Sequence, residues 1–348
     1  MYKIATLNNI SPKGLIHFND KYHITENIDE SQGIIVRSAK MHDMDFSDNL
    51  LAIARAGAGV NNIPIDKCSE KGIVVFNTPG ANANAVKELV LAGLLLSSRK
   101  IARAIQWTET LKGKGDEVGP LVEKGKKNFA GSEIKGKTLA VIGLGAIGVM
   151  VANAASALGM NVIGYDPFIS VKSALELSRK IKLTDNLDEL LGQTHYITLH
   201  VPVVDATRGM MNKEKFALMR EGVKLLNFSR GEIVDDNALV EAVEAGIVSR
   251  YVTDFPNETL LGIENIINIP HLGASTPESE ENCAIMAVDE ISDYIENGNI
   301  TNSVNYPDCS LGICTATGRI ALLHKNIPNM LGKISNVLGD HNINIKDM

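Results

Sequence analysis

The stretch of the chain from Leu139 to Ala152 restricts the fold more than any other part of the sequence. It begins as an apolar strand, turns at glycines with the spacing G-x-G-x-x-G, and continues as an apolar helix; these glycines are Gly143, Gly145 and Gly148. The first glycine permits a tight turn, the second lets a pyrophosphate approach the backbone, and the third allows the helix to pack closely on the strand. Free N–H groups at the start of the helix would point at the phosphates. The pattern therefore predicts a dinucleotide site.

An acidic residue stands where such a site needs one. A second apolar strand, Asn161 to Tyr165, follows the helix and ends directly before Asp166. This spacing is typical of a carboxylate that accepts hydrogen bonds from the adenosine ribose. Because the same carboxylate would repel a 2′-phosphate, we expect NAD rather than NADP as the cofactor.

The same region contains no charged residue from Leu139 to Tyr165, which a hydropathy window alone would interpret as a membrane span. Parallel strands covered on both faces are equally apolar, so a buried strand–helix–strand unit explains the pattern. The amino terminus also lacks a basic region followed by an apolar stretch and a cleavage site. We therefore expect a soluble, cytoplasmic protein that does not contact membranes.

Composition narrows the class of protein further. A chain of 348 residues is long enough for two domains of ordinary size. The net charge of −7 and the absence of a long basic block argue against nucleic-acid binding. The four cysteines include no C-x-x-C pair, so we expect buried thiols in a reducing compartment and no metal site; they are Cys68, Cys283, Cys309 and Cys314.

Strands and helices alternate along the chain, which predicts an α/β fold with two doubly wound parallel-sheet domains. We expect residues 1–98 to form the first part of a substrate-binding domain, residues 99–276 a Rossmann domain, and residues 277–310 the return to the first domain. A long helix over Asn82–Ile105 would lead out of the first sheet. A polar loop over Lys112–Gly136 would lead into the second.

The apolar runs that predict strands are short and are separated by polar or helical segments. In the first domain they are Lys3–Leu7, Gly33–Val36, Ile53–Arg55 and Ile73–Phe76. In the second they are Thr138–Ile142, Val162–Tyr165, Tyr196–Leu199, Leu225–Asn227, Tyr251–Thr253 and Ile266–Ile269. An amphipathic helix over Pro277–Asn297 is expected next, and then a tail of strand, turn, helix and strand over Arg319–Met348.

Three polar residues directly follow apolar strands of the second domain, where open parallel sheets bind their ligands. Arg230 suits a substrate carboxylate and a developing carbonyl oxygen, although a structural arginine paired with a helix end is the alternative. His271 could accept a hydroxyl proton during hydride transfer, although a lone histidine is more often structural. Asp254 is the third of these residues. Glu258 is the carboxylate that could orient His271.

A series of short motifs resembles the D-isomer-specific 2-hydroxyacid dehydrogenases in both residues and order. They are Gly143–Gly148, Tyr165–Pro167, His200–Pro202, Asn227–Gly231, Val234–Asp235, Thr253–Asp254 and Pro270–Gly273. Further motifs are similar to the branch of that family that acts on 3-phosphoglycerate. These are Ile35–Ser38, Gly57–Asn61, Asn77–Pro79 and Asn302–Asn305.

The resemblance implies roles for individual residues. Arg230 would bind and polarise the substrate, His271 would exchange the hydroxyl proton, and Glu258 would orient His271 and stabilise its protonated form. Asp254 would contact the nicotinamide carboxamide. The full set implied for the cofactor is Gly143, Gly145, Ala146, Ile147, Gly148, Asp166, Val201, Pro202, Thr207, Phe228, Ser229, Arg230, Asp254, His271, Gly273 and Ala274. The set implied for the substrate is Arg37, Ser38, Gly57, Ala58, Gly59, Val60, Asn61, Arg230 and His271.

One spacing departs from the family pattern. The catalytic acid usually lies five residues after the aspartate, whereas Glu258 lies only four residues after Asp254. A deletion of one residue in this loop accounts for the difference, and Glu258 is the only acid before Glu264. The assignment of Glu258 is kept on that basis.

The activity implied by the resemblance is NAD-dependent oxidation of D-3-phosphoglycerate to 3-phosphohydroxypyruvate, the first step of L-serine biosynthesis. One alternative keeps the hydride transfer and changes the substrate to glycerate, glyoxylate or another 2-hydroxy acid. Another is an NAD-sensing protein similar to the transcriptional corepressors of the family. Arg37 separates the two enzymes, because a phosphorylated substrate needs a cation there.

The resemblance also concerns assembly and regulation. It implies a homodimer or a higher homo-oligomer formed through Asn82–Gly136. The tail resembles the opening of an ACT domain, a small module that binds amino acids, with His324 and Asn326 placed where they could touch an effector. Because this covers about half of such a domain, we expect a partial ACT-like segment over residues 317–348.

Overall fold

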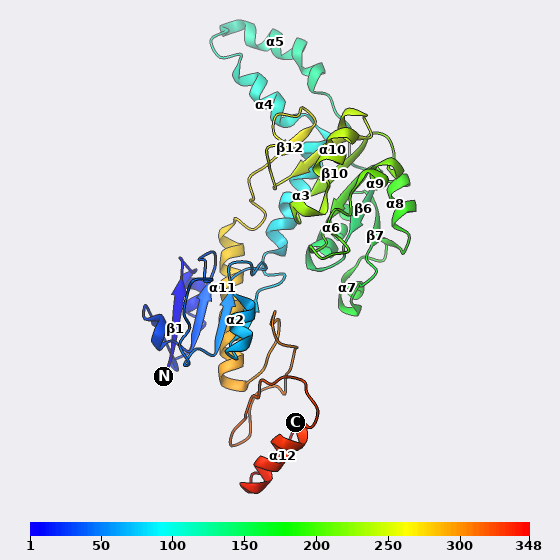
Figure 1. Ribbon diagram of the computed structural model, residues 1–348. Coiled ribbons are helices and arrows are strands. Elements are labelled where there is room, and N and C mark those ends of the chain that lie inside the picture. Colours follow the sequence, from blue (N-terminus) through cyan, green and yellow to red (C-terminus); the bar gives the residue numbers. More distant parts are fainter.

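The computed structural model describes residues 1–348 and contains two separate β-sheets linked by long helices (Figure 1). The strands of the first sheet are β1 (Tyr2–Leu7), β2 (Tyr22–Thr25), β3 (Gly33–Val36), β4 (Ala52–Arg55) and β5 (Val74–Asn77). They are all parallel, in the order β2-β1-β3-β4-β5. The order reverses between β1 and β3, and ligands bind beyond the carboxyl ends of strands at such a switch point.

The second sheet has seven parallel strands in the order β12-β11-β10-β9-β6-β7-β8, with its switch point between β6 and β9. Its strands are β6 (Thr138–Ile142), β7 (Asn161–Tyr165), β8 (Lys182–Thr184), β9 (Tyr196–Leu199), β10 (Val223–Asn227), β11 (Val248–Thr253) and β12 (Ile266–Asn268). The prediction of two parallel α/β sheets is therefore confirmed. None of the helices combines the length and apolar character needed to cross a membrane.

Shorter helices accompany both sheets, and most of them pack on a sheet face. The first sheet has α1 (Pro12–Leu15), α2 (Ile65–Glu70) and the 3-10 turn η1 (Ile28–Glu30). The second has α6 (Ala146–Ala157), α7 (Val171–Glu176), α8 (Leu187–Gln193), α9 (Lys213–Leu218), η4 (Gly231–Ile233) and α10 (Asp236–Glu244). Buried apolar side chains from these helices and strands form the cores on the two faces of each sheet.

Two long helices carry the chain between the sheets. The helix α3 (Ala83–Ser98) follows the first sheet but packs against α6 and β10 of the second. The helix α11 (Pro277–Asn297), which has the predicted bounds, returns to pack against α1, β3 and β4. A Cβ on Gly14 of α1 would lie 2.4 Å from the Cβ of Ala284, so glycine is needed for this close approach. Because α11 also contacts α3, it lies at the boundary between the sheets.

An extended pair of helices projects from the second sheet (Figure 1). The predicted helix over 82–105 is interrupted at Arg99, whose backbone is extended, and continues as α4 (Ile101–Glu109). The prediction of a loop over 112–136 is wrong in part, because the segment contains η2 (Gly115–Glu117), α5 (Val118–Gly125) and η3 (Lys126–Phe129). The ring of Trp107 lies 5.2 Å from that of Phe129, which ties α4 to η3.

The tail differs most from its prediction. It forms one helix, α12 (Met330–Asp340), and none of the expected strands, so the ACT-like segment is not confirmed. A strand needs a neighbour for its backbone hydrogen bonds, and none lies beside this segment. Arg319 ties the tail to the body by donating to the carbonyl oxygens of Asn297 (2.6 Å) and Gly312 (2.7 Å). Cys309 is exposed and Cys314 half-buried, so the expectation of buried thiols holds only for the other two cysteines.

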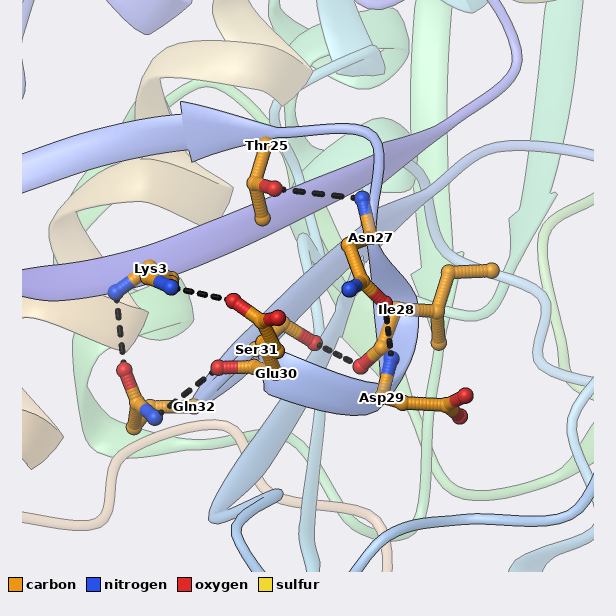
Figure 2. A network of polar contacts seen from close by, with 8 residues as sticks. All are labelled: Lys3, Thr25, Asn27, Ile28, Asp29, Glu30, Ser31 and Gln32. Carbon is orange, nitrogen blue, oxygen red and sulfur yellow. Dashed lines mark hydrogen bonds and ion pairs between the residues drawn. The ribbon is translucent and has the colours of Figure 1, made fainter.

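Polar contacts fix the turn between β2 and β3 at the edge of the first sheet (Figure 2). Asn27 accepts a hydrogen bond from the backbone N–H of Asp29 at 3.2 Å. The backbone N–H of Lys3 donates to Oε1 of Gln32 at 2.8 Å. Because Gln32 directly precedes β3, these contacts hold that strand in register with β1.

Candidate active site

The glycine turn between β6 and α6 has the backbone geometry of a dinucleotide site. Gly143 has a φ of +91°, and a Cβ there would lie 2.4 Å from the carbonyl oxygen of His200. A Cβ at Gly148 would lie 1.9 Å from the carbonyl oxygen of Gly143. At Gly145, in contrast, a Cβ would meet no atom within 4 Å. The fold itself therefore requires two of the glycines, and the third leaves open space beside the backbone.

The first turn of α6 offers free backbone donors next to an acid. The helix begins with Ala146 and Ile147, and no side chain caps its N-terminus. Asp166 accepts hydrogen bonds from the backbone N–H groups of Leu144 at 2.8 Å and Phe168 at 2.9 Å. The carboxylate is thereby held beside the glycine turn, where the predicted ribose contact requires it.

His200 lies against this turn from the other side. Its Nε2 is 3.0 Å from Oγ1 of Thr198, and the packing around the half-buried residue lowers its pKa to about 3. The imidazole is therefore neutral. The next residue, Val201, accepts a hydrogen bond of 2.8 Å from the hydroxyl of Ser229, which connects the ends of β9 and β10.

The loop after Val201 uses its polar groups internally. The hydroxyl of Thr207 donates to the carbonyl oxygen of Pro202 at 2.5 Å and accepts from the N–H of Val204 at 2.9 Å. Pro202 is exposed at the edge of the sheet. The contacts of Thr207 and Pro202 with a cofactor stay predictions, because the structure gives Thr207 a loop-closing contact.

A buried asparagine shapes the turn that carries Arg230. Asn227, at the end of β10, donates to the carbonyl oxygen of Arg230 at 2.9 Å and accepts from the N–H of Ser229 at 3.2 Å. The guanidinium of Arg230 donates to the carbonyl oxygen of Ser229 at 2.7 Å. Phe228 is buried in the core, where a Cβ on Gly93 would lie 2.8 Å from its ring. Only its backbone is therefore available to line a nicotinamide pocket.

Arg230 lies close to the first sheet. A Cβ on Gly59 would be 3.6 Å from its Nη2 and 3.7 Å from Oδ1 of Asn61. Gly59 belongs to the loop Gly57–Asn61, whose residue Ala58 accepts a hydrogen bond of 2.6 Å from the amide of Asn77. The structure thus brings the predicted substrate loop and the predicted substrate arginine together from different sheets.

His271 and Asp254 are neighbours at the end of the second sheet. The exposed ring of His271 packs against Phe255 with centroids 4.8 Å apart. Asp254 is 1% exposed, and neither of its carboxylate oxygens has a hydrogen-bond partner. Burial raises the pKa of the Asp254 carboxyl, and the nearby charges of His271 and Arg230 oppose that rise. Buried acceptors are normally paired, so these orphan oxygens fit the N–H groups of a nicotinamide carboxamide.

Glu258 is exposed in the following turn and forms no hydrogen bond or ion pair with His271. The turn is anchored by Asn257, which donates to Asp236 at 2.7 Å and accepts from the N–H of Thr259 at 3.0 Å. The expected pairing of Glu258 with His271 is therefore not formed in this structure. The role of Glu258 towards His271 stays a prediction.

A cavity of about 110 Å³ lies between the carboxyl end of the first sheet and the start of α11. Arg37, Arg55 and Gly57 line it from the first sheet, and Ala274 lines it from the segment after His271. Gly273 lies between His271 and Ala274 and is buried. A Cβ on this glycine would lie 3.4 Å from the Asp254 carboxylate. No group of three His, Cys, Asp or Glu side chains that could hold a metal ion is present.

The turn that carries Arg37 is fixed at the β1/β3 switch point. Asn8, at the end of β1, has a φ of +75°. Its side-chain oxygen accepts hydrogen bonds of 2.8 Å from the backbone N–H groups of both Ser38 and Ala39. The backbone N–H of Ser38 is thus used within the turn, and its contact with a substrate stays a prediction.

Arg55 is a site residue that the sequence analysis missed. It pairs in register with Val36 and donates from Nε to the carbonyl oxygen of Arg37 at 3.1 Å. Burial lowers the pKa of its guanidinium, and the positive charges of Arg37 and Arg230 act in the same direction. Arg37 and Arg55 therefore share one cavity, and Arg230 lies near enough for its charge to act on Arg55. The signal was present, since Arg55 ends an apolar strand much as Arg230 follows one.

The comparisons with known proteins agree with this geometry. Residues 91–273 match the family described as D-isomer specific 2-hydroxyacid dehydrogenase, NAD binding domain. The D-3-phosphoglycerate dehydrogenase of Methanocaldococcus jannaschii is 36% identical over 298 residues, which cover 83% of this chain and 54% of that protein. The chain therefore spans about half the length of this relative and of a second archaeal one.

Two further similarities cover nearly the whole of the other protein. The hydroxypyruvate reductase of Thermotoga maritima is 39% identical over 285 residues, which cover 78% of this chain and 87% of that protein. A crystal structure of NAD+-bound 3-phosphoglycerate dehydrogenase from Entamoeba histolytica has a TM-score of 0.68 and 27% identity, covering 88% of this chain and 99% of the other.

Proposed function

Because the chain belongs to the D-isomer specific 2-hydroxyacid dehydrogenase family, we propose that it oxidises D-3-phosphoglycerate to 3-phosphohydroxypyruvate with NAD, the first step of L-serine biosynthesis. The observation that carries the substrate assignment is the convergence of Arg37 and Arg55 beside Arg230. One arginine suffices for the carboxylate of a 2-hydroxy acid, and two more suit a phosphate on the same molecule.

The substrate would lie across the boundary between the sheets. Arg37 and Arg55 bind its phosphate at the end of the first sheet. The loop Gly57–Asn61 and Arg230 bind its carboxylate, since a Cβ at Gly59 would already fall within contact distance of the guanidinium. This places the reacting carbon on the side of the second sheet, towards His271.

The proton and the developing charge are assigned to two residues. Bound NAD supplies the acceptor for the hydride. His271 takes the proton of the hydroxyl group, and Arg230 stabilises the carbonyl oxygen that forms. Glu258 is assigned to orient His271 and stabilise its protonated form, while Asp254 offers its unpaired oxygens to the carboxamide.

The test is steady-state turnover of the purified protein with NAD+ and either D-3-phosphoglycerate or D-glycerate. We expect kcat/KM to be at least about tenfold higher for the phosphorylated substrate, because two charge-assisted contacts are lost with the other. The Thermotoga relative carries the name hydroxypyruvate reductase, and a preference for D-glycerate or hydroxypyruvate would favour that alternative. Binding of NAD without turnover of any 2-hydroxy acid would favour an NAD-sensing protein.

The projecting helices α4 and α5 support a homodimer. They expose the apolar side chains of Ile101, Ile105 and Val118, and α4 buries no residue of its own. Arg103 of α4 pairs with Glu264, and the exposed apolar side chains of the arm are suited to an equivalent arm of a second copy. Light scattering should give twice the mass of one chain, and Ile105→Glu should give a monomer.

A cytoplasmic location is proposed from the thiols. All four cysteines are unpaired, and two of them lie buried in the core of the first domain. Free thiols persist in reducing compartments. Fractionation of cells that produce the protein would test the location directly.

A further inference from the structure

Arg37 is not free in this structure. Its Nη2 forms an ion pair of 2.7 Å with Oε1 of Glu280, and both side chains are about two-fifths exposed. Glu280 lies in the first turn of α11, and it is the only acidic residue in the wall of the cavity that Arg37 and Arg55 line. The arginine that is proposed to bind the substrate phosphate is therefore already paired with a carboxylate.

We propose that Glu280 is a specificity-determining residue that competes with the substrate phosphate for Arg37 and so sets the affinity of the site for anions. This inference rests on the proposed function, because it names the group that the phosphate must displace. The carboxylate and the phosphate would use the same donors of one guanidinium. Substrate binding then exchanges one ion pair for another.

Electrostatics gives the exchange its direction. The guanidinium groups of Arg37 and Arg55 line the cavity together with the single carboxylate of Glu280, so the cavity keeps a net positive charge while Glu280 stays bound. A phosphate dianion gains more from these charges than the single charge of Glu280 does. It also suffers more repulsion from that carboxylate than an unphosphorylated 2-hydroxy acid does. Glu280 therefore weakens binding of phosphorylated ligands most.

The alternative role, in which Glu280 holds Arg37 in position for the phosphate, has less support. The backbone on both sides of Arg37 is already fixed. Asn8 accepts from the N–H groups of Ser38 and Ala39, and Arg55 donates to the carbonyl oxygen of Arg37. The backbone that carries the arginine is thus placed without help from α11.

Ser279 provides a donor for the incoming phosphate. It is 3% exposed, its hydroxyl has no hydrogen-bond partner, and it lines the same cavity next to Glu280. An unpaired buried hydroxyl is costly, which indicates that it finds a partner when the site is filled. Once Glu280 is displaced, the hydroxyl can donate to a phosphate oxygen.

The test compares Glu280→Gln with Glu278→Gln in the full chain. Glu278 lies in the same turn of α11, is exposed and does not line the cavity, so its substitution removes the same charge without freeing Arg37. We expect Glu280→Gln to lower KM for D-3-phosphoglycerate about three- to tenfold and KM for D-glycerate less than twofold. Glu278→Gln should change neither KM. Ser279→Ala should raise KM for the phosphorylated substrate.

Direct binding of inorganic phosphate keeps the inference separate from the proposed function. By calorimetry, Glu280→Gln should bind phosphate more tightly than the unaltered protein even if D-3-phosphoglycerate is not turned over. A higher KM or weaker phosphate binding in Glu280→Gln would show that the residue positions Arg37 instead. Equal effects of the Glu280 and Glu278 substitutions would also overturn the inference. They would show that only the long-range charge of the carboxylates, and not the ion pair with Arg37, affects phosphate binding.

Discussion

Arg230 and Gly59 face one another across the boundary between the two sheets, with 3.6 Å between Nη2 of the arginine and the point where a Cβ on the glycine would lie. Arg230 comes from the turn after β10, and Gly59 from the loop after β4. The two halves of the carboxylate site are therefore already within reach of one ligand. The space beside Gly59 is the space that the ligand needs.

Gly59→Ala is expected to raise KM for the 2-hydroxy acid about tenfold, because the new methyl group would take up part of that space. The methyl group would meet its neighbours at 3.6 and 3.7 Å, which is ordinary contact, so the thermal midpoint should hardly change. Gly57→Ala is the matched contrast. Its φ of +139° and a Cβ only 1.5 Å from the Arg55 guanidinium predict a clear loss of stability. A normal KM in Gly59→Ala would place the substrate elsewhere.

Cofactor choice depends on Asp166. We expect the unaltered protein to use NAD at least about tenfold better than NADP, because the carboxylate would repel a 2′-phosphate. Asp166→Ala should narrow that preference and also raise KM for NAD, since the Leu144 N–H of the glycine turn loses its acceptor. Initial rates with both cofactors measure the two effects. Equal use of NAD and NADP by the unaltered protein would contradict the role of Asp166.

Kinetic measurements can distinguish the role of His271 from that of its carboxylate partner. His271→Ala should lower kcat by about a hundredfold or more with little change in NAD binding, because general-base catalysis contributes that much. If Glu258 stabilises the protonated imidazole, Glu258→Gln should move the pH–rate profile to lower pH. If Glu258→Gln leaves the pH–rate profile unchanged, the assignment of Glu258 fails.

Local sequence patterns predicted the parts of the fold that rest on local causes. The strands before Asp166, Arg230 and Asp254 are mostly apolar where they cross the core, which made them visible. The edge strand β8 is short and mostly exposed, so it lacked that signal. The expected tail strands failed for another reason. A strand depends on a neighbour that no local pattern can guarantee.

The residues of the active site also fall into those that local sequence patterns identify and those that only the tertiary packing brings together. Glycines and residues at strand ends could be identified because the topology of a parallel sheet brings strand ends together. The pairing of Arg37 with Glu280 joins segments from opposite ends of the chain, and only the packing of α11 on the first sheet creates it. The turn of Glu258 shows the converse. Its one-residue deletion was visible in the sequence, but the resulting separation from His271 was not.

Glu290 on α11 should make stability depend on pH. It is 8% exposed, accepts a hydrogen bond of 2.9 Å from Asn302, and burial raises its pKa from 4.5 to about 8. Between these values the folded protein holds a proton that the unfolded chain releases, so stability falls as the pH rises from 4.5 to 8. Glu290→Gln should therefore be more stable than the unaltered protein at pH 8, by up to about 4 kcal/mol, with no gain near pH 4.5. Urea unfolding at several pH values measures this, and a gain that is independent of pH would contradict it.

Arg37→Ala tests the identity of the substrate. The arginine follows a buried strand, lines the cavity and is held by the Asn8 turn, so its loss should remove one charge-assisted contact to the phosphate. We expect kcat/KM for D-3-phosphoglycerate to fall about ten- to a hundredfold, while activity on unphosphorylated 2-hydroxy acids stays nearly constant.

The loss in Arg37→Ala should include repulsion from Glu280, which would then face the phosphate unpaired. Arg37→Ala combined with Glu280→Gln is therefore expected to recover part of the activity on the phosphorylated substrate, without reaching that of the unaltered protein. If Arg37 instead serves only to stabilise its own domain, both substrate classes lose activity equally and the thermal midpoint falls with them. That outcome, or a preference of the unaltered protein for D-glycerate, would move the activity to unphosphorylated 2-hydroxy acids.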